Sequence, residues 1–210
     1  MKTIGLLGGM SWESSAVYYR AINQGVQQAL GGLHSAKIVL YSVDFAEIEH
    51  LQQIGDWQSA GGLLQKAAQS LQAAEADCVV LCTNTMHKVA EQICDGLYIP
   101  LLHIADATAV QLVKAGIKTV GLLGTNFTME QAFYKGRLVE HYGLQVVIPN
   151  EADRQIIHQV IYQELCLGQV NAVSKAEYLR IIQALAEQGA EAVILGCTEI
   201  GLLVQQTDTA

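Results

Sequence analysis

The chain repeats itself. Residues 2–8 have the sequence KTIGLLG, and residues 118–124 have the similar sequence KTVGLLG, 116 positions further on. A second pair of similar segments contains Cys82-Thr83 and Cys197-Thr198, and these cysteines are 115 positions apart. A chain of two similar halves can fold into two similar lobes related by a pseudo-two-fold axis. We therefore expect two domains, residues 1–102 and 103–210, with one of these cysteines in each.

Each half alternates short apolar runs with longer segments of helical spacing. Short continuous apolar runs are typical of strands that are buried on both faces. Regular alternation of strands and helices predicts an α/β fold, in which each lobe is a parallel sheet flanked by helices. The expected strands are 3–7, 37–43, 78–81, 99–102, 119–123, 144–148 and 192–195. The expected helices are 12–30, 45–53, 56–74, 85–94, 106–115, 128–142, 153–167 and 171–188.

Composition limits the partners of this chain. Hydrophobic residues make up 51% and charged residues 15% of the sequence, and the formal net charge is −8. No basic cluster is present to hold phosphates, so we expect neither a nucleic acid nor a membrane as partner. No apolar run has the length of a transmembrane segment or of a signal peptide. The five cysteines are an odd number without the spacing of a metal site, which favours a reducing cytoplasm and predicts no metal.

Four loops are candidates for the functional site. In open α/β sheets, ligands bind beyond the carboxyl ends of the strands. The loops that follow this rule are 8–11, 82–85, 124–126 and 196–199. Cys82 and Cys197 each end an apolar strand just before an expected helix N-terminus, which would lower the pKa of each thiol. Two such thiols facing each other across the cleft between the lobes suit proton removal and proton delivery on opposite sides of one carbon.

Other interpretations of these residues are weaker. A cysteine after an apolar run is often a small core residue, and we interpret Cys78, Cys94 and Cys166 in this way. The repeat argues against this interpretation for Cys82 and Cys197, which occupy matching positions in the two halves. His87 and His103 lie near the candidate loops, but such histidines are more often surface or core residues than catalysts. The N-terminal glycines do not match a dinucleotide-binding motif, and neither a P-loop nor a serine-hydrolase motif occurs.

At these loops the chain resembles the aspartate/glutamate racemase family, and most of all its broad-specificity amino-acid racemases. The segments that carry the resemblance are 5–14, 81–87, 103–108, 123–125 and 196–200. The resemblance covers nearly the whole chain. It implies an amino-acid racemase that needs neither pyridoxal phosphate nor another cofactor, has two α/β lobes, and forms a homodimer.

The resemblance also implies roles for particular residues. One of Cys82 and Cys197 removes the α-proton of the amino acid, and the other returns a proton to the opposite face. Most of the other site residues would contact the carboxylate or the ammonium group, and one would select the substrate side chain. The contact residues are Met10, Thr83, Asn84, Thr85, Thr125 and Thr198, and the side-chain selector is Gln52.

Two features depart from the family pattern. Members that select acidic substrates have a basic residue where this chain has Ile156, with Arg154 two positions earlier. This argues against strict aspartate or glutamate specificity. Family members also continue beyond the position of residue 210, normally with another strand and helix. Two alternatives stay open: a maleate isomerase-like enzyme, in which a cysteine adds to a double bond, and a non-catalytic amino-acid-binding module.

Overall fold

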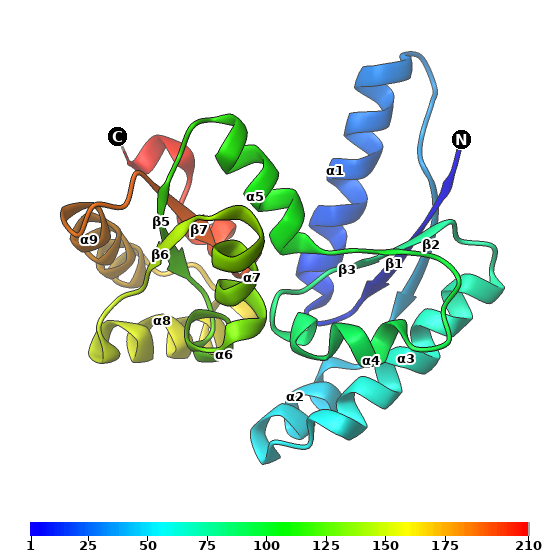
Figure 1. Cartoon of the computed structure of the whole chain (residues 1–210), viewed down its shortest axis with the longest axis horizontal. Coiled ribbons are helices and arrows are strands. Elements are labelled where there is room, and N and C mark those ends of the chain that lie inside the picture. Colours follow the sequence, from blue (N-terminus) through cyan, green and yellow to red (C-terminus); the bar gives the residue numbers. More distant parts are fainter. Residues whose placement is uncertain (210) are drawn as a thin grey trace. The chain divides into compact units, whose positions relative to one another are not determined.

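The computed structural model describes residues 1–209 and divides into two compact units. Unit 1 is Met1–His103 and unit 2 is Ile104–Ala210. Each unit contains its own parallel sheet with helices packed against it (Figure 1). The predicted α/β class, with two parallel sheets flanked by helices, is confirmed. In the part of the chain that the structure describes, no helix combines the length and apolar character that crossing a bilayer would require.

Unit 1 is built on a four-stranded sheet in the order β2-β1-β3-β4, and all neighbouring strands are parallel. The strands are β1 (Thr3–Gly8), β2 (Lys37–Ser42), β3 (Cys78–Leu81) and β4 (Leu101–Leu102). The helices are α1 (Trp12–Leu30), α2 (Phe45–Ile54), α3 (Trp57–Ala73), the 3₁₀ helix η1 (Thr85–Val89) and α4 (Ala90–Cys94). Helix α1 covers one face of the sheet, and α3 and α4 cover the other (Figure 1).

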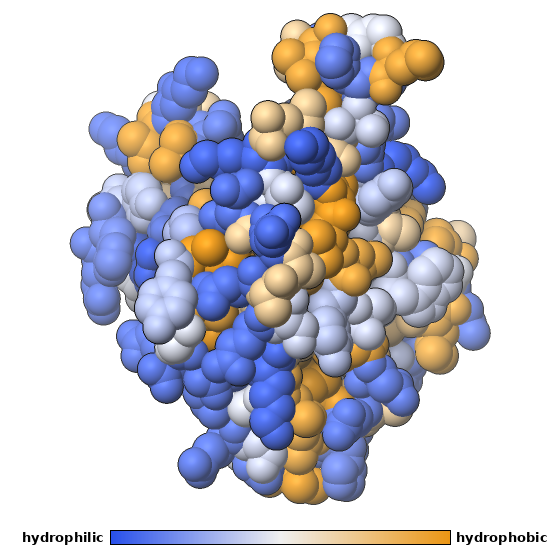
Figure 2. Space-filling view, turned by 90° about the vertical axis from the view of Figure 1, so that its right-hand side faces the viewer, coloured by the Kyte–Doolittle hydropathy of each residue, from blue (hydrophilic) through white to orange (hydrophobic). Residues whose placement is uncertain are grey.

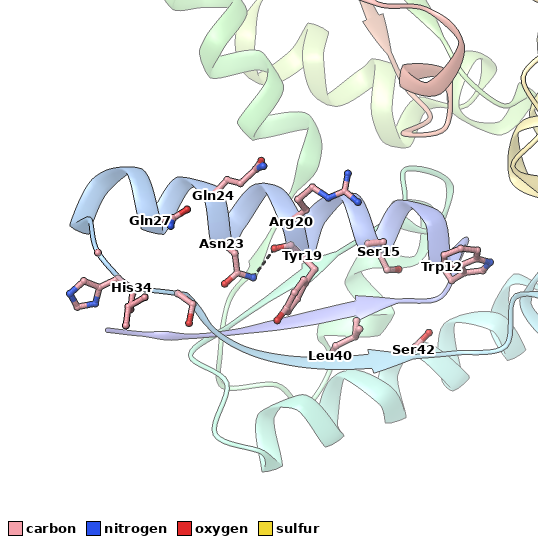
Figure 3. A pocket seen from close by; sticks show the side chains of 14 residues that line it. Trp12, Ser15, Tyr19, Arg20, Asn23, Gln24, Gln27, His34, Leu40 and Ser42 are labelled. Carbon is pink, nitrogen blue, oxygen red and sulfur yellow. Dashed lines mark hydrogen bonds between the residues drawn. The ribbon is translucent and has the colours of Figure 1, made fainter.

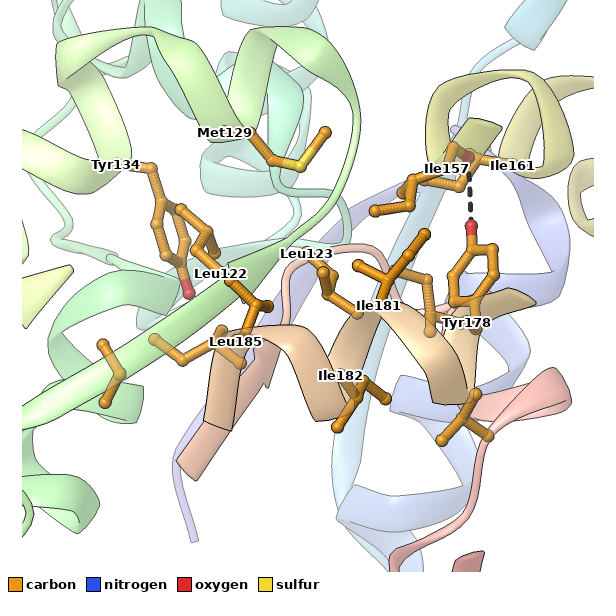
Figure 4. Packing of buried hydrophobic residues seen from close by; sticks show 14 of the residues in the cluster. Leu122, Leu123, Met129, Tyr134, Ile157, Ile161, Tyr178, Ile181, Ile182 and Leu185 are labelled. Atoms are coloured by element: carbon orange, nitrogen blue, oxygen red, sulfur yellow. Dashed lines mark hydrogen bonds between the residues drawn. The ribbon is translucent and has the colours of Figure 1, made fainter. Parts of the chain in front are cut away.

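Unit 2 is built on a three-stranded parallel sheet in the order β6-β5-β7. The strands are β5 (Thr119–Leu123), β6 (Gln145–Val147) and β7 (Ala192–Leu195). The longer helices are α5 (Ile104–Lys114), α7 (Ala132–Tyr142), α8 (Glu151–Gln163) and α9 (Ala172–Glu187). The short helices are α6 (Asn126–Glu130), η2 (Leu165–Leu167), α10 (Ile200–Leu203) and η3 (Gln206–Asp208). The core of this unit packs β5 against α8 and α9, and the Tyr178 hydroxyl donates to the Ile157 carbonyl at 3.0 Å (Figure 4).

The repeat in the sequence is a repeat in structure. Strand β1 pairs with β3, with Leu7 opposite Leu81, and β5 pairs with β7, with Leu123 opposite Leu195. Gly5 and Gly121 occupy matching positions in β1 and β5. A Cβ atom at Gly5 would lie 3.0 Å from the Ala76 Cβ, and one at Gly121 would lie 3.0 Å from the Leu185 Cδ1. In both repeat strands, neighbouring side chains pack so closely against the glycine backbone that a larger residue would displace them.

Local polar chemistry explains where several helices begin. Ser11 caps α1 through its side chain, as do Asp44, Asp56 and Asn150 for α2, α3 and α8. Such side chains accept one of the free N–H groups at a helix start. The predicted bounds of α1, and the cap at Asp56, follow this chemistry and are confirmed.

The structure corrects three predicted helices and one strand. The segment predicted as one helix over 85–94 is a 3₁₀ turn followed by α4, and the segment 128–142 contains two helices, α6 and α7. Gln131 between them has extended backbone angles, φ −88° and ψ 152°. Both sides of this break bury apolar side chains, so the periodicity continues through it and conceals it. The helix predicted over 153–167 ends as the separate turn η2, and only Leu101–Leu102 of the strand predicted over 99–102 pairs.

Candidate functional site

The loop after β1 is fixed by close packing. Gly9 has φ +95°, and a Cβ atom there would lie 2.2 Å from the Val43 carbonyl oxygen. Only glycine fits such a position. The N–H of Gly9 donates to the buried Ser15 Oγ at 2.8 Å, and this hydroxyl also contacts the Ser11 carbonyl at 3.1 Å. The Ser15 side chain therefore holds the glycine loop in place.

Cys82 lies directly beyond β3 and is completely buried. Its N–H donates to the Leu7 carbonyl at 2.9 Å, and its Sγ contacts the Val80 carbonyl at 3.8 Å. Burial raises the pKa of the Cys82 thiol to about 12. The prediction that a helix N-terminus lowers this pKa is wrong. The following helix is one 3₁₀ turn that begins only at Thr85, so loss of hydration dominates.

The residues after Cys82 form a buried polar turn. Asn84 and Thr85 are 5% and 6% exposed. The Oδ1 atom of Asn84 is buried without a hydrogen-bond donor among residues 1–209. A buried acceptor normally has a partner, so this atom is suited to a ligand that donates. Of the predicted contact residues, Thr83 lies half-buried in the same turn.

Met10 and Gln52 lie in the same unit as this turn. Gln52 is buried, and its Nε2 lies 3.0 Å from the Met86 Sδ, one residue beyond Thr85. Met10 and Met86 belong to one hydrophobic cluster. The predicted unit 1 residues are thus near the carboxyl ends of β1 and β3.

The two histidines near this turn contact each other. The Nδ1 atom of His87 lies 2.8 Å from the Thr83 carbonyl oxygen, and the ring centroids of His87 and His103 are 4.4 Å apart. Because the Thr83 carbonyl can only accept, the Nδ1 of His87 carries the proton. His87 therefore supports the backbone of the cysteine loop.

A separate groove of about 870 Å³ lies on unit 1 between α1, residues 32–35 and β2 (Figure 3). Tyr19, Arg20 and Asn23 line it from the helix, and Leu40 lines it from the strand. None of the predicted site residues lines this groove. Figure 2 shows the side of unit 1, where apolar side chains interrupt the polar surface. This groove is therefore a surface feature distinct from the thiol loops.

In unit 2, the loop after β5 is held by its own side chains. The Thr125 Oγ1 accepts from the Thr128 N–H at 3.3 Å and so caps α6. The N–H of Asn126 donates to His158 Nδ1 at 3.2 Å, and burial lowers the pKa of His158. His158 was missed by the sequence analysis. The one indication in the sequence is that His158 lies in the same predicted helix as Ile156. The contact with Asn126 joins residues 32 positions apart, so local sequence does not predict it.

Cys197 lies beyond β7 beside a carboxylate. Its Sγ contacts the Glu199 Oε2 at 2.9 Å, and the Thr198 hydroxyl donates to the same oxygen at 3.2 Å. Glu199 is only 3% exposed. Burial raises the pKa of the Cys197 thiol well above its usual value, and the charge and hydrogen bond of Glu199 raise it further. The predicted lowering by a helix is wrong here too, because α10 spans only Ile200–Leu203.

The two loops of unit 2 touch. A Cβ atom at Gly124 would lie 3.0 Å from the Gly196 carbonyl oxygen, so glycine lets the loops after β5 and β7 approach. The N–H of Gly196 donates to the Leu123 carbonyl at 2.6 Å. Thr125, Cys197 and Thr198 are therefore near the carboxyl ends of two paired strands, as predicted for a ligand site. Glu199 was part of the motif but received no predicted role.

Arg154, the basic residue closest in sequence to Ile156, is already engaged by other groups. The Nε of Arg154 lies 2.8 Å from Glu130 Oε1, and its Nη1 donates to the Pro149 carbonyl at 2.8 Å. Ile156 is partly buried against the core of unit 2. Among the described residues, no group of three or more His, Cys, Asp or Glu side chains is placed to hold a metal ion.

Comparisons with known proteins agree on one family. The family model "Asp/Glu/Hydantoin racemase" matches residues 7–210. The broad specificity amino-acid racemase RacX of Bacillus subtilis is 23% identical over 96% of this chain and 87% of its own length.

Solved structures agree with this match. A "putative Asp/Glu Racemase" from Yersinia pestis is 57% identical with a TM-score of 0.92, over 100% of this chain and 91% of its own. An aspartate racemase homologue from Pyrococcus horikoshii is 33% identical with a TM-score of 0.82, over the same shares of both chains. The chain belongs to the Asp/Glu/Hydantoin racemase family.

Proposed function

We propose that this protein is a racemase of amino acids that works without pyridoxal phosphate, with Cys82 and Cys197 as its two proton-transferring groups. The observation that carries the proposal is the matching place of the two thiols. Each follows the strand that pairs with a copy of the repeated glycine-rich strand, β3 beside β1 and β7 beside β5. In a family of racemases, two such thiols match a reaction that needs two proton-transferring groups.

The chemistry explains why two thiols are needed. Racemisation removes a weakly acidic proton from one face of the α-carbon and returns a proton to the other face. One base would have to move around the substrate, whereas two fixed groups avoid this motion. The raised pKa values of both thiols make each thiolate a stronger base toward carbon and keep each resting thiol protonated, ready to donate. The mechanism requires one bound amino acid to meet both thiols.

The polar side chains have complementary roles in this proposal. Negative charge develops on the carboxylate oxygens as the proton leaves, and preorganised donors stabilise such charge. Thr83 and Thr85 can donate to the carboxylate. Thr125 and Thr198, whose hydroxyl donates to Glu199, lie beside the second thiol and contact the substrate from there. The unpartnered Oδ1 of Asn84 can accept from the ammonium group. Met10 and Gln52 then contact the rest of the substrate.

We propose a substrate range that includes neutral amino acids. Ile156 offers no charge to an acidic side chain, and Arg154 is engaged by Glu130 and Pro149. The similarity to a broad specificity racemase supports the same range. A panel of L- and D-amino acids, neutral and acidic, tests this range in a chiral assay. Turnover of aspartate and glutamate alone would contradict it.

Exchange of the α-proton in deuterated water tests the mechanism. The wild-type protein is expected to bring deuterium into the α-position while it interconverts the enantiomers. Cys82→Ser and Cys197→Ser are each expected to abolish racemisation, and each leaves exchange with one enantiomer only, the opposite one in each case. Cys94→Ala is the matched control and keeps full activity, because Cys94 ends α4. Full racemisation by either serine variant would overturn the two-thiol mechanism, and turnover of maleate without α-exchange would assign a different reaction.

We also propose a homodimer in a reducing cytoplasm. The apolar side chains exposed around the α1–β2 groove, among them Tyr19, Leu33 and Leu40, support a subunit contact there. Strand β2 is also an edge of its sheet. Light scattering of the wild type and of Leu40→Asp tests the dimer; equal masses for the two proteins would contradict this interface. The odd number of cysteines supports the reducing compartment.

A further inference from the structure

Unit 2 contains a buried amide oxygen that the proposed mechanism does not use. The Oδ1 atom of Asn126 is buried and, like that of Asn84, receives no hydrogen bond within residues 1–209. A buried acceptor without a donor is costly in a folded protein, so its presence needs an explanation. The backbone N–H of Asn126 is already engaged, since it donates to His158 Nδ1 at 3.2 Å. The unused group is therefore the side-chain oxygen, which is suited to a donor from a ligand.

Asn126 lies next to the candidate site of unit 2. It directly follows Thr125 in the loop after β5. This loop contacts the loop that carries Cys197, because the Gly196 N–H donates to the Leu123 carbonyl at 2.6 Å. The thiol of Cys197 acts at the α-carbon in the proposed reaction. A group further along the neighbouring loop is placed to meet the substrate side chain.

His158 supplies a donor beside this acceptor. Because its Nδ1 accepts from the Asn126 N–H, the neutral ring carries its proton on Nε2. Burial lowers the pKa of His158 more than the charge of Glu130 raises it, which keeps the ring neutral near neutral pH. The ring lies against Phe127 and Tyr162, with centroids 6.2 Å and 4.9 Å away. Its Nε2–H donates to no group in the described part of the chain.

The surroundings of this pair favour neither a negative nor a positive substrate side chain. Glu130 is the charged group that acts on His158, and Arg154 Nε already pairs with it at 2.8 Å. A substrate carboxylate would meet no free cation here and would lie beside the Asn126 oxygen, which repels it. An ammonium group could donate to that oxygen but could accept nothing from the His158 Nε2–H. One acceptor and one donor, both uncharged, remain to be matched.

We propose that Asn126 and His158 select substrates whose side chain ends in a carboxamide, as in glutamine and asparagine. This names the substrate class of the proposed racemase and rests on that function. The carboxamide N–H donates to Asn126 Oδ1, and the carboxamide oxygen accepts from His158 Nε2–H. A carboxylate of the same shape offers acceptors alone, and a thioether offers no strong donor or acceptor. Both residues determine specificity, and neither takes part in proton transfer.

Substrates of similar length test this selection in the wild type. Glutamine, glutamate and methionine differ mainly in the chemistry at the end of the side chain. In a chiral assay, kcat/KM for glutamine is expected to exceed that for the other two by about tenfold or more, because analogues leave the polar groups of the site unpaired. Asparagine and aspartate give the same comparison for a shorter side chain. Absence of a preference for either amide, or faster turnover of serine and threonine than of both amides, overturns the proposal.

Two variants connect the preference to these residues. Asn126→Ala removes the acceptor, and His158→Phe removes the donor while it keeps an aromatic ring beside Phe127 and Tyr162. In each variant the ratio of kcat/KM for glutamine to that for methionine is expected to fall about tenfold. A damaged fold would lower both values together and leave their ratio. An unchanged ratio in either variant overturns the proposal.

Asn171→Ala is the matched control in the same unit. The Oδ1 of Asn171 has a donor, the Val173 N–H at 2.9 Å, and it caps α9 (Ala172–Glu187). Its substitution is expected to lower the urea midpoint and to leave the substrate ratio unchanged. Asn126→Ala should do the opposite, because its Oδ1 gives up no hydrogen bond. A lower midpoint without a changed ratio in Asn126→Ala would make this asparagine structural and overturn its role.

Binding measurements separate this proposal from the racemase function. Calorimetric titration of the wild type is expected to show about tenfold tighter binding of glutamine than of glutamate. In nitrogen NMR spectra of histidine-labelled protein, the His158 signal, identified by its absence in His158→Phe, should shift with glutamine and not with methionine. A protein that shows both results but exchanges no α-proton would refute the racemase function alone. A protein that racemises methionine and glutamine equally would refute the carboxamide selection alone.

Discussion

The two thiol loops share a sequence pattern and differ in electrostatics. Cys82 is completely buried beside an amide and hydroxyls, with the pKa of its thiol raised by burial alone. Cys197 is half-buried, and the negative charge of Glu199 raises the pKa of its thiol in addition to the effect of burial. A repeat therefore gives two thiols the same place in two sheets without giving them the same chemistry. The difference arises from one residue two positions after the second cysteine.

The supporting loops diverge as well. Strand β1 ends at Gly8 and is followed by Gly9, whereas the matching residues Gly124 and Thr125 follow β5. Gly9 has a positive φ and lies against the backbone of Val43, while Thr125 has φ −65° and caps a helix with its side chain. In unit 1 the loop is held because Gly9, which has no side chain, packs against the Val43 backbone. In unit 2 the loop is held by the hydrogen bond of the Thr125 side chain.

Exchanging the residues that follow the repeated glycine should give the largest effect. Gly9→Thr places a side chain 2.2 Å from the Val43 carbonyl and is expected to lower the free energy of unfolding by about 3 kcal/mol. The reverse exchange, Thr125→Gly, loses only a cap that glycine partly replaces, so we expect less than about 1 kcal/mol. Urea unfolding followed by circular dichroism measures both. Equal losses would show that the two loops are built alike.

Asn84 offers the next largest effect, on activity and not on stability. Asn84→Ala is expected to lower kcat/KM by about 100-fold, because the proposed acceptor for the ammonium group is lost. The urea midpoint should stay within error of the wild type, since Oδ1 has no donor among the described residues. A large loss of stability with unchanged kcat/KM would make this asparagine structural.

Acid stability should separate two aspartates near helix starts, Asp153 in the first turn of α8 and Asp56 at the cap of α3. Hydrogen bonding to Arg180, whose Nη2 lies 2.5 Å from Oδ1, lowers the pKa of the buried Asp153. A lowered pKa in the folded state means stability that is present above the unfolded pKa of about 4 and is lost as the pH falls through the folded value. Asp153→Asn is expected to lose about 1–2 kcal/mol at pH 7 and to flatten this acid dependence.

Asp56, which is partly exposed, provides the matched comparison. Its pKa is lowered by Ser59, and asparagine caps a helix about as well as aspartate does. Asp56→Asn should therefore change the unfolding midpoint at pH 7 less than Asp153→Asn does. Urea unfolding between pH 3 and pH 7 tests both variants, and a pH profile of Asp153→Asn that matches the wild type would refute the assignment.

The smallest effect is expected at the cap of α6. Thr125→Ala removes the acceptor for the Thr128 N–H and should lower the free energy of unfolding by about 1 kcal/mol. Ser11→Ala, at the cap of α1, serves as its counterpart in unit 1. Thr125→Ala that also abolishes activity at full stability would give this hydroxyl a direct role in substrate binding.

Much of the fold could be predicted from the sequence. Strands β3, β5 and β7 were predicted with their observed bounds, because short apolar runs between turns have few alternatives. Helix α1 was also predicted with both its ends, since Ser11 and Gly31 specify them locally. The breaks near Val89 and Gln131 were not predictable, because apolar spacing continues across them and the backbone there is set by packing.

The sequence by itself determined which chemical groups this protein has and where they fall in two copies of one pattern: thiols after strands, glycines where backbones must approach, and hydroxyls and amides in the loops between. Tertiary structure alone decided the properties of those groups. Burial, together with Glu199 for one of them, raised the pKa of both thiols where local sequence predicted a lowering. It also brought His158 to Asn126 and Gln52 to Met86. The physical reason is that hydration and charge depend on neighbours in space, which are distant in the chain.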